Sequence, residues 1–525
     1  MKKLILALIV ACCALSGCTN LEETVYSQLP KEEFFTSESQ LKTYSARPYT
    51  LLQNWAVEQS MWTMVLQLGN EVAVPRSYNG SWTEPRYREL HTHRMQTNNK
   101  LIRTSWEFCF NLIAGCNDVI YEVENSGEMT DAKRKTIAEM KTLRAYSYML
   151  AMDCWGNIPY SVSKTESGYP EVKGRDFFFP FIETEIKENM DYLDETPTPA
   201  NYGRATRDMA LFMLAKLYLN AEVWTGKPMW AEAEAVCKEI IESGHYSLTS
   251  TYKENFQVHN ENSSEAIFAV PYSTGKTTSD KRAFYVWCLT LNADTEKLYN
   301  VAGTWNGSFI GQPDFMATYD SADKRKKDTF LFGKVFDKSG NPWRIAIGTD
   351  RSGNPVYGEY VLEDVDIDEG KYISGLARTD GARIIKWEYQ DDGSLTGYDV
   401  SMENDFILMR YADVVLMYVE ALVRQNRAAE AAAVADFATI RTRSGLSPMT
   451  EADLTLDGLF IERQHELALE GWARQDLIRF GKYLDKWWAK EAGEERELLL
   501  PIPEEMRGAN PNLTQNPGYS SPSDK

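Results

Sequence analysis

Cysteine and histidine are scarce in this chain. Its 525 residues include 8 cysteines and 5 histidines. Cys12, Cys13 and Cys18 lie near the N-terminus, and the other five cysteines form no CxxC spacing. This pattern excludes a disulfide framework and a cysteine-based zinc site, and His91 and His93 lie two residues apart without zinc-ligand spacing. We expect no metal, no cofactor and a buried, apolar role for the five cysteines: Cys109, Cys116, Cys154, Cys237 and Cys288.

Apolar runs of membrane-spanning length are also missing. The one long run covers residues 4–15 and follows Lys2 and Lys3. It is shorter than the roughly 20 residues that a transmembrane helix needs. A short apolar run after basic residues is typical of a cleavable secretory signal, so the chain is predicted to be exported.

The end of this signal indicates a lipid anchor. The run closes with Leu-Ser-Gly-Cys at Cys18, which resembles a bacterial lipobox. We therefore predict a signal peptide over residues 1–17, a lipid on Cys18 and a polar tether over residues 18–35. An ordinary signal peptide with an incidental cysteine is the alternative.

Positive charge is in deficit. The formal net charge is −20, which argues against nucleic acid or anionic lipid as a ligand and favours a neutral one. Aromatic residues, by contrast, make up 12% of the chain, with 14 Trp and 28 Tyr. Because these rings combine a large apolar surface with a polar edge, we expect some of them to face solvent.

Amphipathic helical segments occur in pairs. Apolar residues recur every three or four positions in residues 206–224 and again in residues 233–241, before Gly244 as a predicted C-terminal cap. The same spacing predicts further helices: residues 132–155, residues 181–193 and two within residues 407–442. Helical pairs of this length resemble tetratricopeptide hairpins, which stack to bury a shared core. The predicted fold is mainly α: an α-α superhelix of discontinuous, tetratricopeptide-like helix pairs.

The region between the helical pairs has a different character. Residues 246–405 have Gly and Asn punctuation, short apolar runs and little helical period, with hairpin loops predicted at residues 337–341 and 353–354. We predict one domain over residues 36–525, with a helical scaffold at about 36–245 and 406–490 and a loop- and hairpin-rich insertion between them. Loops held by rigid helices often carry function, so we expect the binding site in or near this insertion.

Several motifs, in this order and together with the lipobox, resemble the SusD/RagB family of glycan-binding lipoproteins. The resemblance covers nearly the whole chain and is carried by these stretches: WGNIPY at 155–160, RYADVVLMYVEA at 410–421, IRTRSG at 440–445, the glutamate-rich segment at 462–471, PIP at 501–503, NP at 510–511 and QNPGY at 515–519.

The resemblance implies a function and a location. Members of this family are lipid-anchored in the outer membrane, face the cell exterior and deliver oligosaccharides to a SusC-like, TonB-dependent transporter. It also implies four tetratricopeptide hairpins that form the scaffold against that transporter. The chain is thus expected to bind an oligosaccharide or polysaccharide and to have no enzymatic activity.

Two loop stretches, residues 69–94 and 284–315, are the candidate glycan platform. Sugar rings stack their C–H faces on Trp and Tyr, while their hydroxyls hydrogen-bond to Arg and Asn. Trp82 and Trp305 are the first candidates, because Gly, Asn or Ser neighbours expose each ring. The full set of predicted ligand-binding residues is Arg76, Tyr78, Asn79, Trp82, Tyr285, Trp287, Trp305 and Asn306. For any one of them, ordinary packing is an equal alternative.

Three glutamates could be mistaken for catalytic acids. Glu462, Glu466 and Glu470 follow helical spacing, and we interpret them as structural partners of Arg441 and Arg443. Three alternatives to glycan capture stay open: peptide or other nutrient binding on the same scaffold, a surface glycosidase, and an adaptor of the transporter without a ligand of its own.

Overall fold

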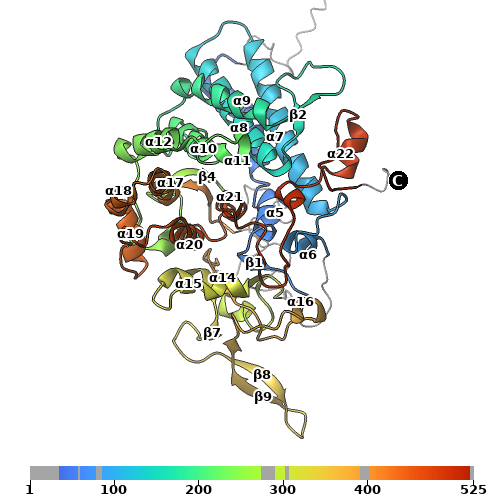
Figure 1. Cartoon of the computed structure of the whole chain (residues 1–525), viewed down its shortest axis with the longest axis vertical. Helices are drawn as coiled ribbons and strands as arrows, with labels where there is room; N and C mark the ends of the chain where they lie inside the picture. The colour runs from blue at the N-terminus through green and yellow to red at the C-terminus, as the bar shows by residue number, and fades with distance from the viewer. Residues whose placement is uncertain are drawn as a thin grey trace, which may run out of the picture.

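The computed structural model describes residues 35–56, 60–77, 85–273, 290–301, 307–390 and 402–520. These residues form a mainly helical molecule with a few two-stranded sheets (Figure 1). Within them, no helix combines the length and the apolar character needed to cross a membrane.

The longest helices, α7 (Lys100–Glu124) and α8 (Asp131–Trp155), pack along each other. Their starts follow from capping, since the Asn99 side chain accepts the amide protons of Leu101 and Ile102 and that of Thr130 accepts from Lys133. The prediction for residues 132–155 is confirmed. Shorter helices precede this pair: α3 (Glu38–Tyr44), α4 (Ala46–Leu52), α5 (Met61–Gln67) and α6 (Pro85–His91).

A second group of helices continues the stack. The predicted pair is confirmed as α10 (Arg207–Leu219) with α11 (Ala221–Thr225), and α12 (Trp230–Ser243), which ends at the left-handed Gly244. α9 (Arg175–Lys187) lies between α8 and α10, and it starts six residues before the predicted segment. Its N-terminal turn was missed because Pro180 lies inside the helix.

The third group follows the insertion and contains one correction. Residues 407–410, predicted as the start of a helix, belong to strand β12 (Phe406–Arg410), which pairs antiparallel with β4 (Ala266–Val270). Tertiary pairing overrides the helical period, because both strands are fully buried. The remaining elements are α17 (Tyr411–Arg424), α18 (Ala428–Ala432), α19 (Ala435–Arg443), α20 (Leu456–Glu466), α21 (Ala473–Arg479), η4 (Glu495–Leu498) and α22 (Glu504–Ala509).

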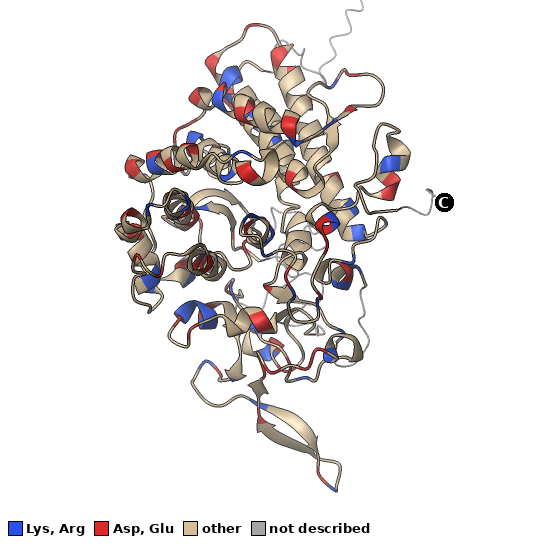
Figure 2. Cartoon of the chain, viewed as in Figure 1, with Lys and Arg blue, Asp and Glu red and all other residues tan. Residues whose placement is uncertain are grey.

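Contacts run in series through these groups, from α8 to α9, α10, α12, α17 and α20. One large core cluster extends through all three groups, from Phe35 to Leu513. Such stacking is typical of a superhelix of helix pairs, as predicted. Figure 2 shows acidic and basic residues interspersed along these helices.

The described parts of residues 246–405 contain only short elements. Both predicted hairpin loops are confirmed: Asp337 and Asn341 share a backbone hydrogen bond of 2.9 Å, and the turn at 353–354 joins β8 (Arg344–Thr349) to β9 (Pro355–Glu359). The β8–β9 hairpin projects from the end of the molecule opposite α9 (Figure 1). The other elements include η2 (Tyr252–Phe256), η3 (Glu296–Leu298), β5 (Ile310–Gly311), α14 (Pro313–Ala317), α15 (Lys324–Thr329), α16 (Lys371–Ser374) and β11 (Arg383–Ile384).

The cysteines in the described residues are free and buried. They are Cys109, Cys116, Cys154 and Cys237, and Cys288 lies outside that part of the chain. Burial raises the pKa of Cys154 to about 12, so its thiol stays protonated at neutral pH. The apolar role predicted for these four residues is confirmed.

Candidate functional site

Most of the predicted ligand residues lie outside the described residues. These are Tyr78, Asn79, Trp82, Tyr285, Trp287, Trp305 and Asn306, and the predicted lipid-bearing Cys18 lies outside as well. Arg76 is the described member of the set. The described part of the site consists of Arg76 and the adjoining ends of the two loop stretches.

The two loop stretches pair with each other where they leave the folded core, at the described ends that we call their roots. Strand β1 (Val72–Ala73) comes from the first stretch and β5 from the second, and they pair antiparallel with Val72 opposite Gly311. The amide of Gln312 also donates to the carbonyl of Glu71 at 3.0 Å. Segments more than 200 residues apart in the sequence thus leave the core side by side.

Ring packing adds a second link between the stretches. The buried ring of Tyr87 meets that of Phe309 edge-on, with centroids 5.3 Å apart. Arg383 donates to the carbonyl of Gly307 at 2.7 Å, which holds the chain where the second stretch returns to the core. The described ends of both stretches are therefore held against each other and against the core.

Arg76 lies directly beyond β1, against α16. Its amide donates to the carbonyl of Tyr372 at 3.0 Å and its carbonyl accepts from the amide of Leu376 at 3.1 Å. Gly375, with φ of 113°, permits this approach because an added Cβ would lie 3.1 Å from the carbonyl oxygen of Ser77. Arg76 is half-buried, and its Nε has no hydrogen-bond partner among the described residues.

Some polar residues of the two stretches are structural. Asn292 is buried and accepts from the amides of Asp294 and Thr295, which caps a turn. Glu71 is buried below β1, where burial raises its pKa to about 8 and Lys386 lowers it in part. Glu71 is therefore protonated at neutral pH and offers no free charge to a ligand.

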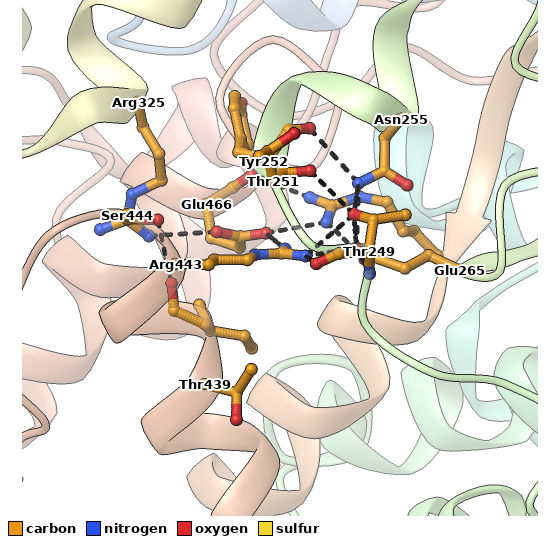
Figure 3. Close-up of polar contacts among 12 residues, drawn as sticks. Thr249, Thr251, Tyr252, Asn255, Glu265, Arg325, Thr439, Arg443, Ser444 and Glu466 are labelled. Carbon is orange, nitrogen blue, oxygen red and sulfur yellow. Dashed lines mark hydrogen bonds and ion pairs between the residues drawn. The ribbon is translucent and has the colours of Figure 1, made fainter.

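The three glutamates near the C-terminus lie in a buried ion network, and Figure 3 shows the part around Glu466 with Arg325, Arg443 and Glu265. Glu466 pairs with Arg410 at 2.8 Å, with Arg443 at 2.6 Å and with Arg325 at 3.1 Å. Arg410 and Arg443 also pair with Glu265, at 2.8 and 2.5 Å. Thr249 and Asn255 complete the shell around Glu265 by donating hydrogen bonds to it.

The other two glutamates belong to the same network. Glu462 pairs with Arg325 at 2.8 Å and also with Arg441. Glu470 pairs with Arg410 at 2.8 Å and with Lys386 at 2.8 Å. The structural interpretation and the predicted partners Arg441 and Arg443 are thus confirmed.

The network holds its carboxylates in the ionised form. Burial alone raises the pKa of Glu265, but Arg410 and Arg443 outweigh it and leave this pKa below its usual range. The pKa of Glu466 is lowered in the same way, by Arg443, Arg410 and Arg325 against burial. Neither group is placed to serve as a proton donor near neutral pH, since a general acid needs a raised pKa.

Sequence reasoning missed Arg325, Arg410 and Lys386 as partners. Arg410 is the first residue of the RYADVVLM motif and Arg325 lies in a basic run, so both could be recognised in the sequence as notable cations. Their pairing depends on tertiary contacts with Glu466, 56 and 141 residues away. The network ties the insertion, through Glu265, Arg325 and Lys386, to the helical scaffold.

Stacked helix pairs form the scaffold, and a strand pair joins the described ends of the two loop stretches. The sequence profile of the SusD family matches residues 264–497, and a profile described as starch-binding, associating with the outer membrane, matches residues 40–202. The chain belongs to the SusD/RagB family, and this family association places it at the outer membrane.

Similar proteins support this assignment. The starch-binding protein SusD of Bacteroides thetaiotaomicron is 27% identical over 422 residues, which cover 74% of each chain. A SusD superfamily protein from Parabacteroides distasonis has a similar fold, with a TM-score of 0.71, 21% identity and coverage of 94% of this chain and 100% of that one. Surface glycan-binding protein A of B. thetaiotaomicron, solved with laminarihexaose, gives a TM-score of 0.72 at 19% identity, with 91% and 99% covered. All three are named as binding or superfamily proteins, and none is named as an enzyme.

Proposed function

We propose that this protein captures a neutral oligosaccharide or polysaccharide at the cell surface and delivers it, unmodified, to a partner transporter. The observation that carries this proposal is the β1–β5 pairing, which brings the roots of two aromatic-rich stretches together. Trp82 and Trp305 would supply stacking surfaces, and Arg76 would supply hydrogen bonds to hydroxyls.

The names of the relatives support a glycan ligand. One is named for starch and another was solved with laminarihexaose. The aromatic content of the two stretches and the pairing of their roots support a neutral glycan as the ligand. The identity of the sugar would depend on the spacing of the rings within the loops.

Capture without hydrolysis fits the chemistry of the four glutamates in the ion network. A glycosidase needs one raised-pKa acid and a second carboxylate across a cleft. Glu265, Glu462, Glu466 and Glu470 are instead buried and bound to cations. A reducing-end assay on bound polysaccharide is expected to show no release of sugar.

The proposal includes an anchor and a partner. Cys18 would carry the lipid, residues 18–35 would form the tether, and residues 36–525 would form one domain facing the exterior. The stacked helices would form the docking face for a SusC-like, TonB-dependent transporter. Co-purification of the two proteins from detergent-solubilised outer membranes is expected.

An affinity gel tests the site. Electrophoresis through gels that contain starch, laminarin or other plant and host polysaccharides should retard the wild-type protein in at least one of them. The double variant Trp82→Ala/Trp305→Ala should lose this retardation. The control Tyr169→Ala removes a ring that is 61% exposed and lies outside both stretches, and it should migrate like the wild type.

The outcomes of this test are distinct. Retardation of the double variant equal to that of the wild type would remove both tryptophans from the site. Binding of peptides but of no polysaccharide in the panel would replace the glycan with a peptide ligand.

A further inference from the structure

A separate hollow of about 380 Å³ lies between the segment after α9 and the segment before β4. Its lining includes Tyr202, His245, Tyr246, Glu261 and Asn262, and none of its lining residues belongs to the stretches 69–94 or 284–315. This volume falls within the range of small-molecule sites, and aromatic rings with a few polar groups are the usual lining of such sites.

Contacts with the protein interior fix the side chain of Tyr202. Its hydroxyl donates to Asp405 at 2.7 Å, and its ring packs on a small apolar cluster that contains Ala269 and Ile407. Asp405 is itself fixed, since it accepts from the amide of Tyr272 at 2.9 Å. Because the hydroxyl is engaged in the protein interior, the half-exposed part of Tyr202 offers mainly ring surface to the hollow.

Tyr246 is anchored in a similar way on the other side. Its hydroxyl donates to the buried Asp208 at 3.0 Å, and its ring stacks on Tyr411 with centroids 6.3 Å apart. His245 Nδ1 also bonds to Asp208, at 2.8 Å. Two rings whose polar ends are tied to buried carboxylates therefore flank one hollow, so a ligand can stack on them without any need to order the rings first.

The polar groups of the hollow are available to a ligand. Glu261 and Asn262 are exposed, and neither side chain makes a hydrogen bond to another described residue. A carboxylate and an amide at the mouth can accept from and donate to hydroxyl groups. The carboxylate also disfavours an anionic ligand.

The hollow continues beyond Tyr202. A neighbouring hollow of about 360 Å³ shares Tyr202 with the first and is also lined by Gly203 and Tyr49. Gly203, with φ of 73°, permits the turn, because an added Cβ would lie 2.9 Å from Pro271 Cδ. Tyr202 thus stands between two adjacent hollows, an arrangement that suits a chain of linked rings better than one compact molecule.

We infer that these adjoining hollows form a second saccharide subsite, in which Tyr202 and Tyr246 stack on sugar rings and Glu261 and Asn262 hydrogen-bond to hydroxyls. The inference rests on the proposed function for its ligand class and adds a second contact with the same neutral glycan. Two subsites on one protein raise the retention of a long chain, because the second contact forms at a high effective concentration.

Isothermal titration with maltohexaose and laminarihexaose tests the subsite, with the affinity-gel panel as a second readout. The wild type should bind hexasaccharide at two sites. The double variant Glu261→Ala/Asn262→Ala should keep one site and lose at least about tenfold in affinity at the other, since two hydrogen-bonding groups of ordinary strength contribute at least that much. Both residues are exposed and make no hydrogen bond to the described residues, so the fold should be unaffected.

A matched control and the loop variant separate the possible results. Glu166→Ala/Tyr169→Ala removes an exposed carboxylate and an exposed ring from another loop and should leave both sites intact. Trp82→Ala/Trp305→Ala should leave only the second site.

Each remaining outcome is decisive. A single wild-type site that Glu261→Ala/Asn262→Ala does not change would overturn the subsite and leave the proposed function standing. Absence of binding to every saccharide in the panel would overturn both. Peptide binding that this variant abolishes would overturn the saccharide assignment of the hollow.

Discussion

Glu466→Gln should strongly destabilise the protein. The substitution keeps the shape of the side chain but removes a charge that pairs with Arg410, Arg443 and Arg325 within 3.1 Å. Glu466 and Arg325 are fully buried. Breaking a buried ion pair by removing one partner costs about 3–5 kcal/mol, because the charge left behind remains out of water.

The expected loss lies at the upper end of that range. Arg410 and Arg443 keep Glu265 as a partner, and Arg325 keeps Glu462, so no cation is left without a carboxylate. Three cations, however, each lose one partner at once. We therefore expect the free energy of unfolding to fall by about 4–5 kcal/mol.

Urea unfolding followed by circular dichroism measures this change. Glu430→Gln is the matched control, since Glu430 also pairs with an arginine, Arg427, but at an exposed site. The control should unfold at the wild-type urea concentration. A Glu466→Gln midpoint equal to that of the control would refute the view that the network holds the insertion on the scaffold.

The dependence on pH gives an independent check. The pKa values of Glu265 and Glu466 are lower in the folded protein than in the unfolded chain, mainly because Arg410 and Arg443 offset the effect of burial. The stability that these groups contribute is present above the unfolded pKa of about 4.3 and is lost as the pH falls further. The wild type should therefore lose stability below about pH 4.5, and Glu466→Gln should lose less.

Three further predictions concern other parts of the chain. Burial raises the pKa of Glu71 to about 8, so the free energy of unfolding of the wild type should decline between about pH 4.5 and 8 through this group. In urea unfolding at a series of pH values, Glu71→Gln should lack that decline. Parallel pH curves for the two proteins would contradict this. Of the five cysteines that follow Cys18, the four that the structure describes should resist a thiol reagent until the protein unfolds, because they are buried. Rapid reaction of two or more native thiols would count against the fold. Cys18→Ser should move the protein from the membrane fraction to the soluble fraction, and an unchanged membrane fraction would exclude the lipid anchor.

The helices of the scaffold were predictable because their periodicity is local. Apolar residues recur at helical spacing in α8, α10 and α12, and a side-chain cap or Gly244 marks an end of each. Only α12 buries a narrow stripe, whereas α10 is buried on all sides. β12 was not predictable in this way. Its residues are apolar on both faces, and only the pairing with β4, about 140 positions earlier, makes them a strand.

The candidate site was predictable in composition but not in geometry. The aromatic and polar content of residues 69–94 and 284–315 is visible in the sequence, whereas the β1–β5 pairing and the Tyr87–Phe309 contact that join them are not. Individual residues of the stretches were also ambiguous. Asn292 and Tyr87 look like ligand residues by type, yet packing buries both.

The charged motifs and the aromatic loops have different physical roles. Arg410 is the last residue of β12 and the N-cap of α17, and its guanidinium pairs with Glu265, Glu466 and Glu470 at once. A planar group with five donors can satisfy several carboxylates in a fixed geometry, which a lysine at this position could not do. A junction of this kind requires particular charged residues, because a missing partner leaves a buried charge. None of the described residues of stretches 69–94 and 284–315 belongs to this ion network, so a change of ring in those stretches removes no partner from it. This difference explains why the charged motifs identify the family.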